Sequence, residues 1–483
     1  MVTKQDFRQL DPYIWELPKD YDERMKVPAR IFGNREIFDN AFGDRSIEQL
    51  VNVAMLPGIV KYAMAMPDMH QGYGFPIGGV AAFDYEDGII SPGGVGYDIN
   101  CGVRMLASTL DLEEVAPYLD ELATTINRNC PSGLGGDGAV KLSWKDMNQV
   151  LEEGGRWAKR NGYATEDDLL RTEDGGCMPL ARADAVPDRA KERGIPQMGS
   201  LGSGNHFLEI DVVDEVYDAE VAEAFGLRLG QVVVQIHCGS RGLGHEVCSQ
   251  YLRRLQDAPR RYGIPIPDRE LVAAPFNSEE GQAYTAAMAA AANYAFTNRQ
   301  VLAHFVRLSF EQVLAGKVDS WELQQVYDVT HNMAKVEEHE VDGRRRKLIV
   351  HRKGATRSFP AGHPQLSEVY QKTGQPMLVP GSMGTASYVL VGTAAAMDLT
   401  FGSSCHGAGR TMSRRAATRR MHGAQVRSQL QEQGIAIRAQ SLKGLAEEAP
   451  YAYKDVSLVV DSVAGARIAD KVARVHPVVV VKG

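Results

Sequence analysis

The side chains best suited to bind a metal ion are spread widely along this chain, and they share one local pattern. Asp98 and Cys101 stand close together after a run of small residues, Ser91-Pro-Gly-Gly-Val-Gly-Tyr. Three histidines recur downstream in turn-like segments rich in Gly, Ser or Asn: His206, His237 and His331. Small residues let the backbone approach a bound group closely. A site assembled from such distant segments requires them to fold together, which predicts one compact domain over residues 1–483.

Local patterns predict several elements around these residues. The β-branched runs Gln231–His237 and Val326–His331 each indicate a buried strand that ends in a loop, so both histidines should project from strand ends. Asp342-Gly343 lies between apolar runs and predicts a hairpin turn. The alanine-rich stretch Glu280–Leu314 predicts one long helix whose aromatic residues belong to the core. Shorter helices are predicted near Leu112–Asn127, Lys141–Arg160 and Arg410–Gln433.

These elements predict a mixed α/β (α+β) architecture with several β-sheets covered by helices. A doubly wound sheet is not expected, because the regular alternation of strands and helices that it needs is missing. With 44% hydrophobic and 24% charged residues, the composition is typical of a soluble globular protein. We find no bilayer-spanning run and no signal-peptide pattern. The 6 scattered cysteines favour a reducing cytoplasm, and a monomer is expected because no coiled-coil or swapped-arm pattern is present.

Charge is distributed unevenly along the chain. The net charge of -8 argues against a general nucleic-acid coat, because bulk attraction for phosphates would be weak. Positive residues nevertheless cluster at Arg344–Arg357 and at Arg410–Arg420. Each cluster has two interpretations, a solvated helix face or an edge that faces phosphate. The second cluster directly follows His406, which favours the phosphate interpretation there.

The donor set suggests a specific kind of metal centre. One carboxylate, one thiolate and three imidazoles suffice for two divalent ions, and the thiolate can bridge them. Thiolate and imidazole alone suggest zinc, whereas an aspartate with open positions for phosphate oxygens favours Mn²⁺ or Fe²⁺. Two such ions can neutralise a phosphate and orient an in-line attack. Any single histidine could instead be a hydrogen-bonded core residue, so the prediction rests on their shared setting.

A second group of residues indicates nucleotide chemistry. The Gly/Ser loop Pro380–Ser387 could bind phosphate through its backbone amides, although it lacks the ending of a Walker loop. His406 follows in Ser-Ser-Cys-His-Gly-Ala-Gly-Arg and could attack an α-phosphate, provided that a partner fixes its tautomer. We expect Asp68 to be that partner. Lys482 ends an apolar run that should bury it, which suggests a purine carbonyl or a phosphate as its acceptor.

Taken together, these segments resemble the RtcB family of GTP-dependent RNA ligases over essentially the whole chain. The resemblance rests on these segments: Met66–Gly72, Gly96–Arg104, Gly202–Glu209, His237–Gly244, Val350–Thr356 and Ser404–Arg410. It implies a ligase that joins an RNA 3′-phosphate, or a 2′,3′-cyclic phosphate after hydrolysis, to a 5′-hydroxyl in tRNA splicing or RNA repair. It further implies GTP, two Mn²⁺ ions, a histidine–GMP intermediate and an activated RNA-3′-pp-5′-G end.

The resemblance also implies roles for individual residues. The residues that match the metal ligands, with Cys101 bridging, are Asp98, Cys101, His206, His237 and His331. The catalytic set is His406 as the residue linked to GMP, Asp68 as its partner and Asn205 beside the triphosphate. Guanine would meet Glu209 at its edge, Tyr453 as a stacking ring and Lys482 at O6, while further nucleotide contacts match Ser382, Ser387 and Gly407. The residues that match RNA-phosphate contacts are Arg241, Lys353 and Arg410.

Two rival functions and one partner are also considered. A dinuclear metal-dependent phosphohydrolase could use the same ligands, with His406 as a proton donor. An RNA-binding or chaperone module would use only the basic clusters and would leave the metal-ligand set without purpose. The resemblance further suggests an archease-type activator as a partner. Cys238 departs from the family pattern, in which a small residue such as Ser is expected at that position.

Overall fold

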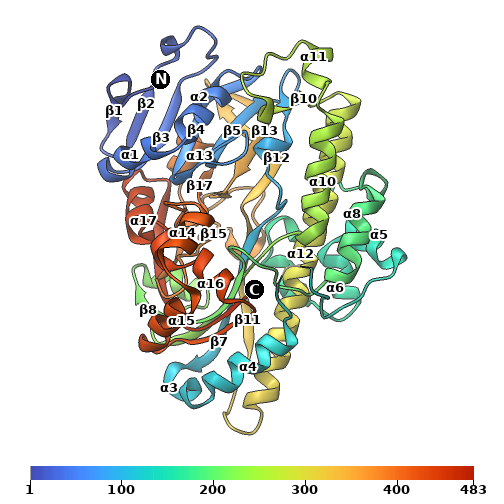
Figure 1. Ribbon diagram of the computed structural model, residues 1–483, viewed down its shortest axis with the longest axis vertical. Helices are drawn as coiled ribbons and strands as arrows, with labels where there is room; N and C mark the ends of the chain where they lie inside the picture. The colour runs from blue at the N-terminus through green and yellow to red at the C-terminus, as the bar shows by residue number, and fades with distance from the viewer. Residues whose placement is uncertain (1, 134) are drawn as a thin grey trace.

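Two large β-sheets and one long central helix form the frame of the molecule (Figure 1). The computed structural model describes residues 2–133 and 135–483. Within these residues one sheet has seven strands, in the order β1 (Arg8–Asp11), β2 (Ile14–Leu17), β3 (Ala29–Phe32), β4 (Ile59–His70), β5 (Ile77–Asp84), β13 (Arg344–Lys353) and β12 (Asn332–Val341). The other has the order β11 (Leu323–Thr330), β7 (Gly102–Asp111), β9 (Gln231–Cys238), β8 (Phe207–Val216), β19 (Ala469–Lys482), β16 (Ser387–Gly392) and β15 (Pro376–Val379), with β18 (Ala436–Ala439) beside β19.

Strand pairing confirms the mixed α/β prediction. Most neighbouring strands are antiparallel, whereas β3 with β4 and β18 with β19 are parallel pairs. Two short antiparallel pairs complete the strands: β6 (Ile89–Ile90) with β10 (Ala274–Pro275), and β14 (Ala355–Arg357) with β17 (Ser403–Cys405). The sequence analysis did not expect a doubly wound sheet, and neither large sheet is a parallel, doubly wound one. How the chain divides into domains stays a prediction.

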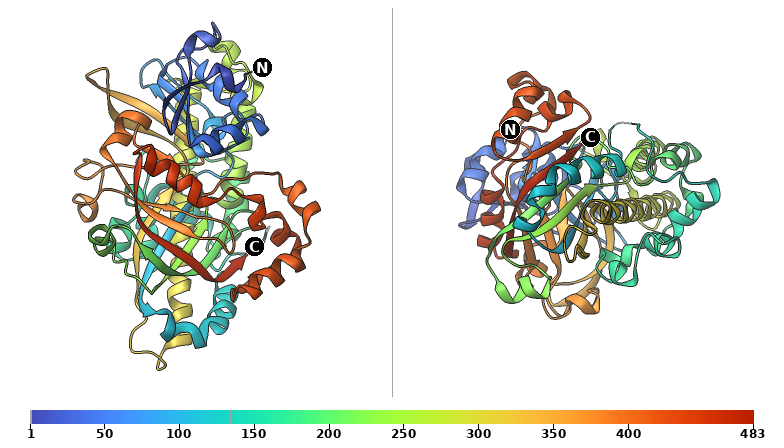
Figure 2. Two further views of the ribbon diagram at one scale, coloured as in Figure 1. Left: turned by 90° about the vertical axis from the view of Figure 1, so that its left-hand side faces the viewer. Right: turned by 90° about the horizontal axis from the view of Figure 1, so that it is seen from below.

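The central helix is α12 (Glu279–Leu314), which matches the predicted helix closely. Ser278 caps its first turn by accepting a hydrogen bond from the Gly281 amide. Tyr294 and Phe296 are buried, as expected of core residues. The helix packs against β9 on one side and against helices on the other, as the end-on view in Figure 2 shows. An alanine-rich helix suits this place because small side chains allow close approach on every side.

The other helices are shorter and surround this frame. They are α1 (Arg35–Asn40), α2 (Ser46–Ala54), α3 (Leu112–Val115), α4 (Leu119–Asn129), α5 (Trp144–Glu153), α6 (Gly155–Arg160), α7 (Glu166–Leu170), α8 (Asp188–Gly194), α9 (Ala219–Ala224), α10 (Arg241–Arg254), α11 (Ala258–Tyr262), α13 (Ala394–Thr400), α14 (Arg414–Arg420), α15 (Gly423–Glu432), α16 (Leu442–Glu447) and α17 (Val456–Gly465). No helix among the described residues is long and apolar enough to cross a membrane.

The three shorter predicted helices are each divided in the structure. The helix predicted over 141–160 breaks at Gly154, whose φ of 53° is left-handed and whose backbone packs against the Gly176 carbonyl. The helix predicted over 410–433 begins only at Arg414 and breaks at Met421, which is extended. The stretch 112–127 is divided into α3, a 3₁₀ turn and α4. Hydrophobic periodicity alone did not reveal these interruptions.

The predicted hairpin is confirmed between β12 and β13. Asp342 and Gly343 have φ values of 51° and 72°, as a tight turn of this kind requires. The first basic cluster therefore lies on β13 and β14, so a solvated helix face is the wrong interpretation for it. Its outer end is exposed at Arg344 and Arg345. Farther along the strand, Arg352 is buried in an ion pair with Glu337 at 2.6 Å.

Candidate active site

Four strand ends of the second sheet meet where the predicted metal ligands lie. Gly102 at the start of β7 pairs with Cys238 on β9, and it also pairs with Thr330 on β11. Phe207 at the start of β8 pairs with His237. The loops at these ends therefore carry their side chains to one place. The expectation that His237 and His331 project from strand ends is confirmed.

A tight turn brings Asp98 and Cys101 together. The Cys101 amide donates to the Asp98 carbonyl at 3.0 Å, and Asn100 between them has a left-handed φ of 53°. The Asp98 Oδ1 atom accepts the Ser240 amide at 3.0 Å, which ties this turn to the loop after β9. Burial alone would raise the pKa of Asp98, but the neighbouring His206 lowers it well below its usual range. Asp98 therefore offers a carboxylate.

Two imidazoles flank the Cys101 sulfur. The His206 Nε2 atom lies 2.8 Å from Asp98 Oδ2 and 3.6 Å from Cys101 Sγ. The His237 Nε2 atom lies 3.2 Å from the same sulfur. Ligand atoms of Asp98, Cys101 and His206 lie within 4.8 Å of one another. Cys101 is thus placed between two histidines, as a bridging ligand would be.

His331 adjoins this group from the junction between β11 and β12. Its Nδ1 atom lies 2.8 Å from Thr356 Oγ1. Its buried Nε2 atom and the buried Nδ1 atom of His237 have no hydrogen-bond partner among the described residues. Burial lowers the pKa of both rings well below the usual value, so they are neutral. Neutral imidazole is the form that binds a metal ion.

These donors fit a divalent ion on their own chemistry. Burial and the Asp98 charge raise the pKa of Cys101 to about 11, so in the free protein it is a thiol. A divalent ion would convert it to a thiolate and would also pair with the orphan Nε2 atom of His331. Three histidine rings are successive neighbours: the ring centroid of His237 lies 5.7 Å from that of His206 and 5.6 Å from that of His331. We call these three rings the histidine row. The histidine row offers donors on both sides of Cys101.

His406 lies next to the histidine row but comes from a different element. Its ring lies 5.3 Å from that of His331. His406 follows β17, and its Nδ1 atom lies 2.5 Å from the Oδ2 atom of Asp68 on β4. The same carboxylate oxygen accepts the His406 amide at 2.9 Å. This contact is the one expected from the sequence, and it leaves Nε2 as the free ring nitrogen.

The buried end of β19 forms the other side of the site. The Lys482 Nζ atom donates to the His206 carbonyl at 2.8 Å, and burial lowers the pKa of this lysine to about 8. Glu209 lies opposite Val480 in the strand pairing, and its buried Oε1 atom has no hydrogen-bond partner among the described residues. Burial and the neighbouring Asp211 raise the pKa of Glu209 well above its usual value. A donor-bearing ligand would satisfy this carboxyl group.

Comparison with known proteins decides the family. The model of the family described as tRNA-splicing ligase RtcB matches residues 49–483. The chain belongs to the RtcB family. The tRNA-splicing ligase RtcB of Thermococcus kodakarensis is 57% identical over 476 residues, which cover 99% of this chain and 98% of that protein. The proteins of the same description from Archaeoglobus fulgidus and Methanococcus maripaludis are 51% and 50% identical, over 99% and 97% of this chain and 98% of each relative.

The remaining residues predicted to contact the nucleotide lie in the Gly/Ser loop, in the loop after His406, and beside Arg410 and His206. The Gly381 amide donates to Ser387 Oγ at 3.0 Å, and the Ser382 amide donates to the hydroxyl of Thr385 at 2.8 Å. The loop that contains Gly407 is joined to this Gly/Ser loop, because the Ala408 amide donates to the Pro380 carbonyl at 3.0 Å. Tyr453 hydrogen-bonds to Glu448 through its hydroxyl. Asn205 is partly buried directly before His206.

The three residues predicted to contact RNA all bind protein acceptors in this RtcB-family fold. Arg241 donates to Ser200 Oγ at 3.1 Å. Lys353 donates to the Phe75 carbonyl at 3.2 Å, and burial lowers its pKa to about 7. Arg410 binds Glu448 at 2.9 Å. Their role toward RNA stays a prediction.

Some residues that contact the site were not predicted from the sequence. Thr356 orients His331, and Ser240 contacts Asp98. Lys454 donates to the backbone on either side of Asp68. Cys238 lies 3.9 Å from His206 Nδ1 and accepts a hydrogen bond from Asn298 at 3.3 Å. Thr356, Ser240 and Cys238 had a sequence signal, since they lie in segments typical of the RtcB family, whereas Lys454 had none.

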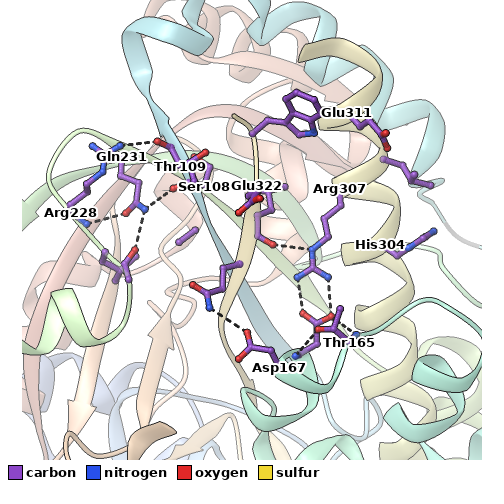
Figure 3. A pocket seen from close by; sticks show the side chains of 18 of the residues that line it. Ser108, Thr109, Thr165, Asp167, Arg228, Gln231, His304, Arg307, Glu311 and Glu322 are labelled. Atoms are coloured by element: carbon purple, nitrogen blue, oxygen red, sulfur yellow. Dashed lines mark hydrogen bonds and ion pairs between the residues drawn. The ribbon is translucent and has the colours of Figure 1, made fainter. Parts of the chain in front are cut away.

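A separate cavity of about 1020 Å³ lies away from these residues (Figure 3). Arg307 and His304 of α12 line it, and Arg307 reaches toward the segment that carries Thr165 and Asp167. The two arginines of the wall are already neutralised, since Arg307 is paired with Asp168 at 2.7 Å and Arg228 is paired with Asp111. None of the residues lining this cavity is a predicted site residue. The candidate active site of this RtcB-family member is therefore the histidine row with Asp98, Cys101 and His406, and not this cavity.

Proposed function

We propose that this chain is a GTP-dependent RNA ligase that joins RNA 3′-phosphate or 2′,3′-cyclic phosphate ends to 5′-hydroxyl ends. The observation that carries this proposal is the position of His406. Asp68 binds the Nδ1 atom of His406, and the His406 ring lies 5.3 Å from that of His331 in the histidine row. This arrangement supports a nucleophilic Nε2 beside a charge-neutralising centre. Membership of the RtcB family supports the ligase class.

The metal centre of the proposal uses donors that lie together in the structure. Two Mn²⁺ ions would be bound by Asp98, Cys101, His206, His237 and His331. When bound, they would neutralise phosphate charge and favour in-line displacement. Cys101 would lie between them because imidazoles flank its sulfur on two sides.

The proposed chemistry proceeds through His406. A cyclic end is first opened by water to a 3′-phosphate. His406 Nε2 then attacks the α-phosphorus of GTP, a P–N bond forms and pyrophosphate leaves, while Asp68 stabilises the imidazolium. An oxygen of the RNA 3′-phosphate next attacks that phosphorus, which breaks the P–N bond and gives the RNA-3′-pp-5′-G end. Finally the 5′-hydroxyl oxygen attacks the RNA phosphorus, and GMP leaves as the phosphodiester forms.

The intermediate steps have an energetic reason. A phosphate monoester is a poor electrophile, because its charge repels a nucleophile and its oxygen is a poor leaving group. Linking it to GMP makes GMP the leaving group. Guanine would be read by the Glu209 carboxyl group and by Lys482, while Tyr453 would stack on the base. Asn205, Ser382, Ser387 and Gly407 would contact the phosphates or sugar.

The deciding experiment is the intact mass of the protein after incubation with GTP and Mn²⁺, with and without a chelator. We expect a metal-dependent gain of one GMP that maps to His406. His406→Ala should remain folded and gain no mass. His476→Ala is the matched control, because that ring is half-exposed and pairs with Asp214. No adduct despite bound Mn²⁺ would favour the dinuclear phosphohydrolase instead.

An RNA assay completes the test of the proposed function. Two RNA fragments, one with a 3′-phosphate and one with a 5′-hydroxyl, should be joined by the unmodified protein and left unjoined by His406→Ala. Contacts of Arg241, Lys353 and Arg410 with RNA remain part of the proposal. An archease-type activator, a monomeric state and a cytoplasmic location stay predictions.

A further inference from the structure

Lys454 is a partly buried lysine whose ammonium group reaches the strand that carries Asp68. Its Nζ atom donates to the Pro67 carbonyl at 2.9 Å and to the Met69 carbonyl at 2.5 Å. These two carbonyls stand directly before and after Asp68 in the chain. Burial lowers the pKa of Lys454 to about 8, while the Asp68 charge opposes that change. The lysine therefore fixes the backbone on both sides of one carboxylate.

The backbone of the same residue binds the segment that follows His406. The Lys454 amide donates to the Gly409 carbonyl at 2.9 Å. The neighbouring Tyr453 forms a β-bridge with Arg410. Gly409 lies so close to the strand of Asp68 that an added Cβ would approach the Asp68 carbonyl oxygen to 2.1 Å. One residue thus connects the Asp68 strand with the His406 loop.

The contact between Asp68 and His406 needs such support. Asp68 is fully buried, and its Oδ1 atom has no hydrogen-bond partner among the described residues. Its Oδ2 atom binds both the amide and Nδ1 of His406. A buried carboxylate is costly unless positive charge and donors surround it. Lys454 is the lysine whose charge acts on Asp68, alongside the imidazole of His406.

We propose that Lys454 is a positioning residue for the His406 nucleophile and that it acts through Asp68. Its two hydrogen bonds set the place of the Asp68 carboxylate, and its charge favours the ionised form. Asp68 then stays on Nδ1, and Nε2 is the nitrogen presented to GTP. The inference rests on the proposed function, because it assumes that His406 accepts GMP. It adds a residue that supports the nucleophile without touching it.

The test measures the rate of GMP transfer to the protein in a single turnover, followed by intact mass at several GTP concentrations. Lys454→Met removes the charge and the donors and retains the length of the side chain. We expect its rate at saturating GTP to fall about 10- to 100-fold, as is usual when a partner of a site residue is removed. The GTP concentration that gives half the maximal rate should change less than about twofold. Lys443→Met is the control, because the Lys443 side chain is 81% exposed on α16.

Each outcome decides the inference. An unchanged rate overturns it, and so does a normal rate with a raised GTP requirement, since that would assign Lys454 to nucleotide binding through Tyr453. In a double-mutant cycle, Lys454→Met should add little to the loss caused by Asp68→Asn, whereas fully additive losses would show that it does not act through Asp68. If Lys454→Met does not fold, Lys454→Gln, which retains an N–H donor, replaces it. Absence of any adduct in the unmodified protein would overturn the proposed function itself.

Discussion

At the scale of single residues, the proposed metal ligands depend on the hydrogen bonds that orient them. Thr356 contacts His331 Nδ1 at 2.8 Å, which directs Nε2 toward the other ligands. Thr356→Val removes that contact at almost constant volume. We predict that the affinity for Mn²⁺ falls about 10- to 100-fold while the fold is retained. Equilibrium dialysis followed by elemental analysis measures this change.

A matched threonine gives the control for that prediction. Thr285 is also buried, and its hydroxyl donates to the Gly281 carbonyl at 2.8 Å within α12. Thr285→Val should bind Mn²⁺ as tightly as the unmodified protein. If both variants lose affinity equally, the effect of Thr356→Val comes from general destabilisation and not from the orientation of His331.

At the scale of elements, α12 supports the turn that carries Cys101. Arg299 of this helix is fully buried and donates to the carbonyls of Asn100 and Cys238 at 2.8 and 2.9 Å. It also pairs with Asp328 of β11 at 2.7 Å. Without Arg299, Asp328 would keep only its second partner, Arg104 at 2.8 Å, and the two buried carbonyls would lose their donor. Arg299→Met should therefore lower the free energy of unfolding by about 3–5 kcal/mol, as measured by urea denaturation.

An exposed arginine provides the comparison for Arg299. The Arg228 side chain is 47% exposed and pairs with Asp111 at the surface. Arg228→Met should change the free energy of unfolding by less than about 1 kcal/mol. Similar losses in the two variants would contradict the idea that α12 stabilises the site through this buried pair.

The sequence predicted those elements whose signal is local. The β-branched runs before His237 and His331 indicated strand ends, and the alanine-rich stretch indicated α12. Breaks such as Gly154 were missed, because a left-handed glycine depends on what packs against it. The contact between His406 and Asp68 was predicted from the chemistry of a histidine nucleophile. Lys454 was not, because nothing in a sequence tells which distant carbonyls a lysine will meet.

At the scale of the whole molecule, the proposed metal centre would join segments of both large sheets and should stabilise the fold. An ion that binds only the folded state at 100 times its dissociation constant adds about 2.7 kcal/mol. Binding also requires a Cys101 thiolate, and burial and the Asp98 charge raise the pKa of this thiol in the free protein to about 11. Below that pH, binding of the ion therefore displaces the proton of the Cys101 thiol. Affinity for Mn²⁺ should therefore rise with pH, by about tenfold per pH unit for each proton released.

This pH dependence can be measured between pH 6 and 8 as the shift in melting temperature that Mn²⁺ causes. The shift should grow with pH, and calorimetry in buffers of different ionisation enthalpy should count the protons released. His206 would add to that count: burial opposes its charge, but Cys238 and Asp98 raise its pKa well above the usual value. Cys101→Ser should release one proton fewer, because a hydroxyl does not ionise in this range. Tight binding of Mn²⁺ without any proton release would contradict a thiolate ligand and, with it, the bridging position assigned to Cys101.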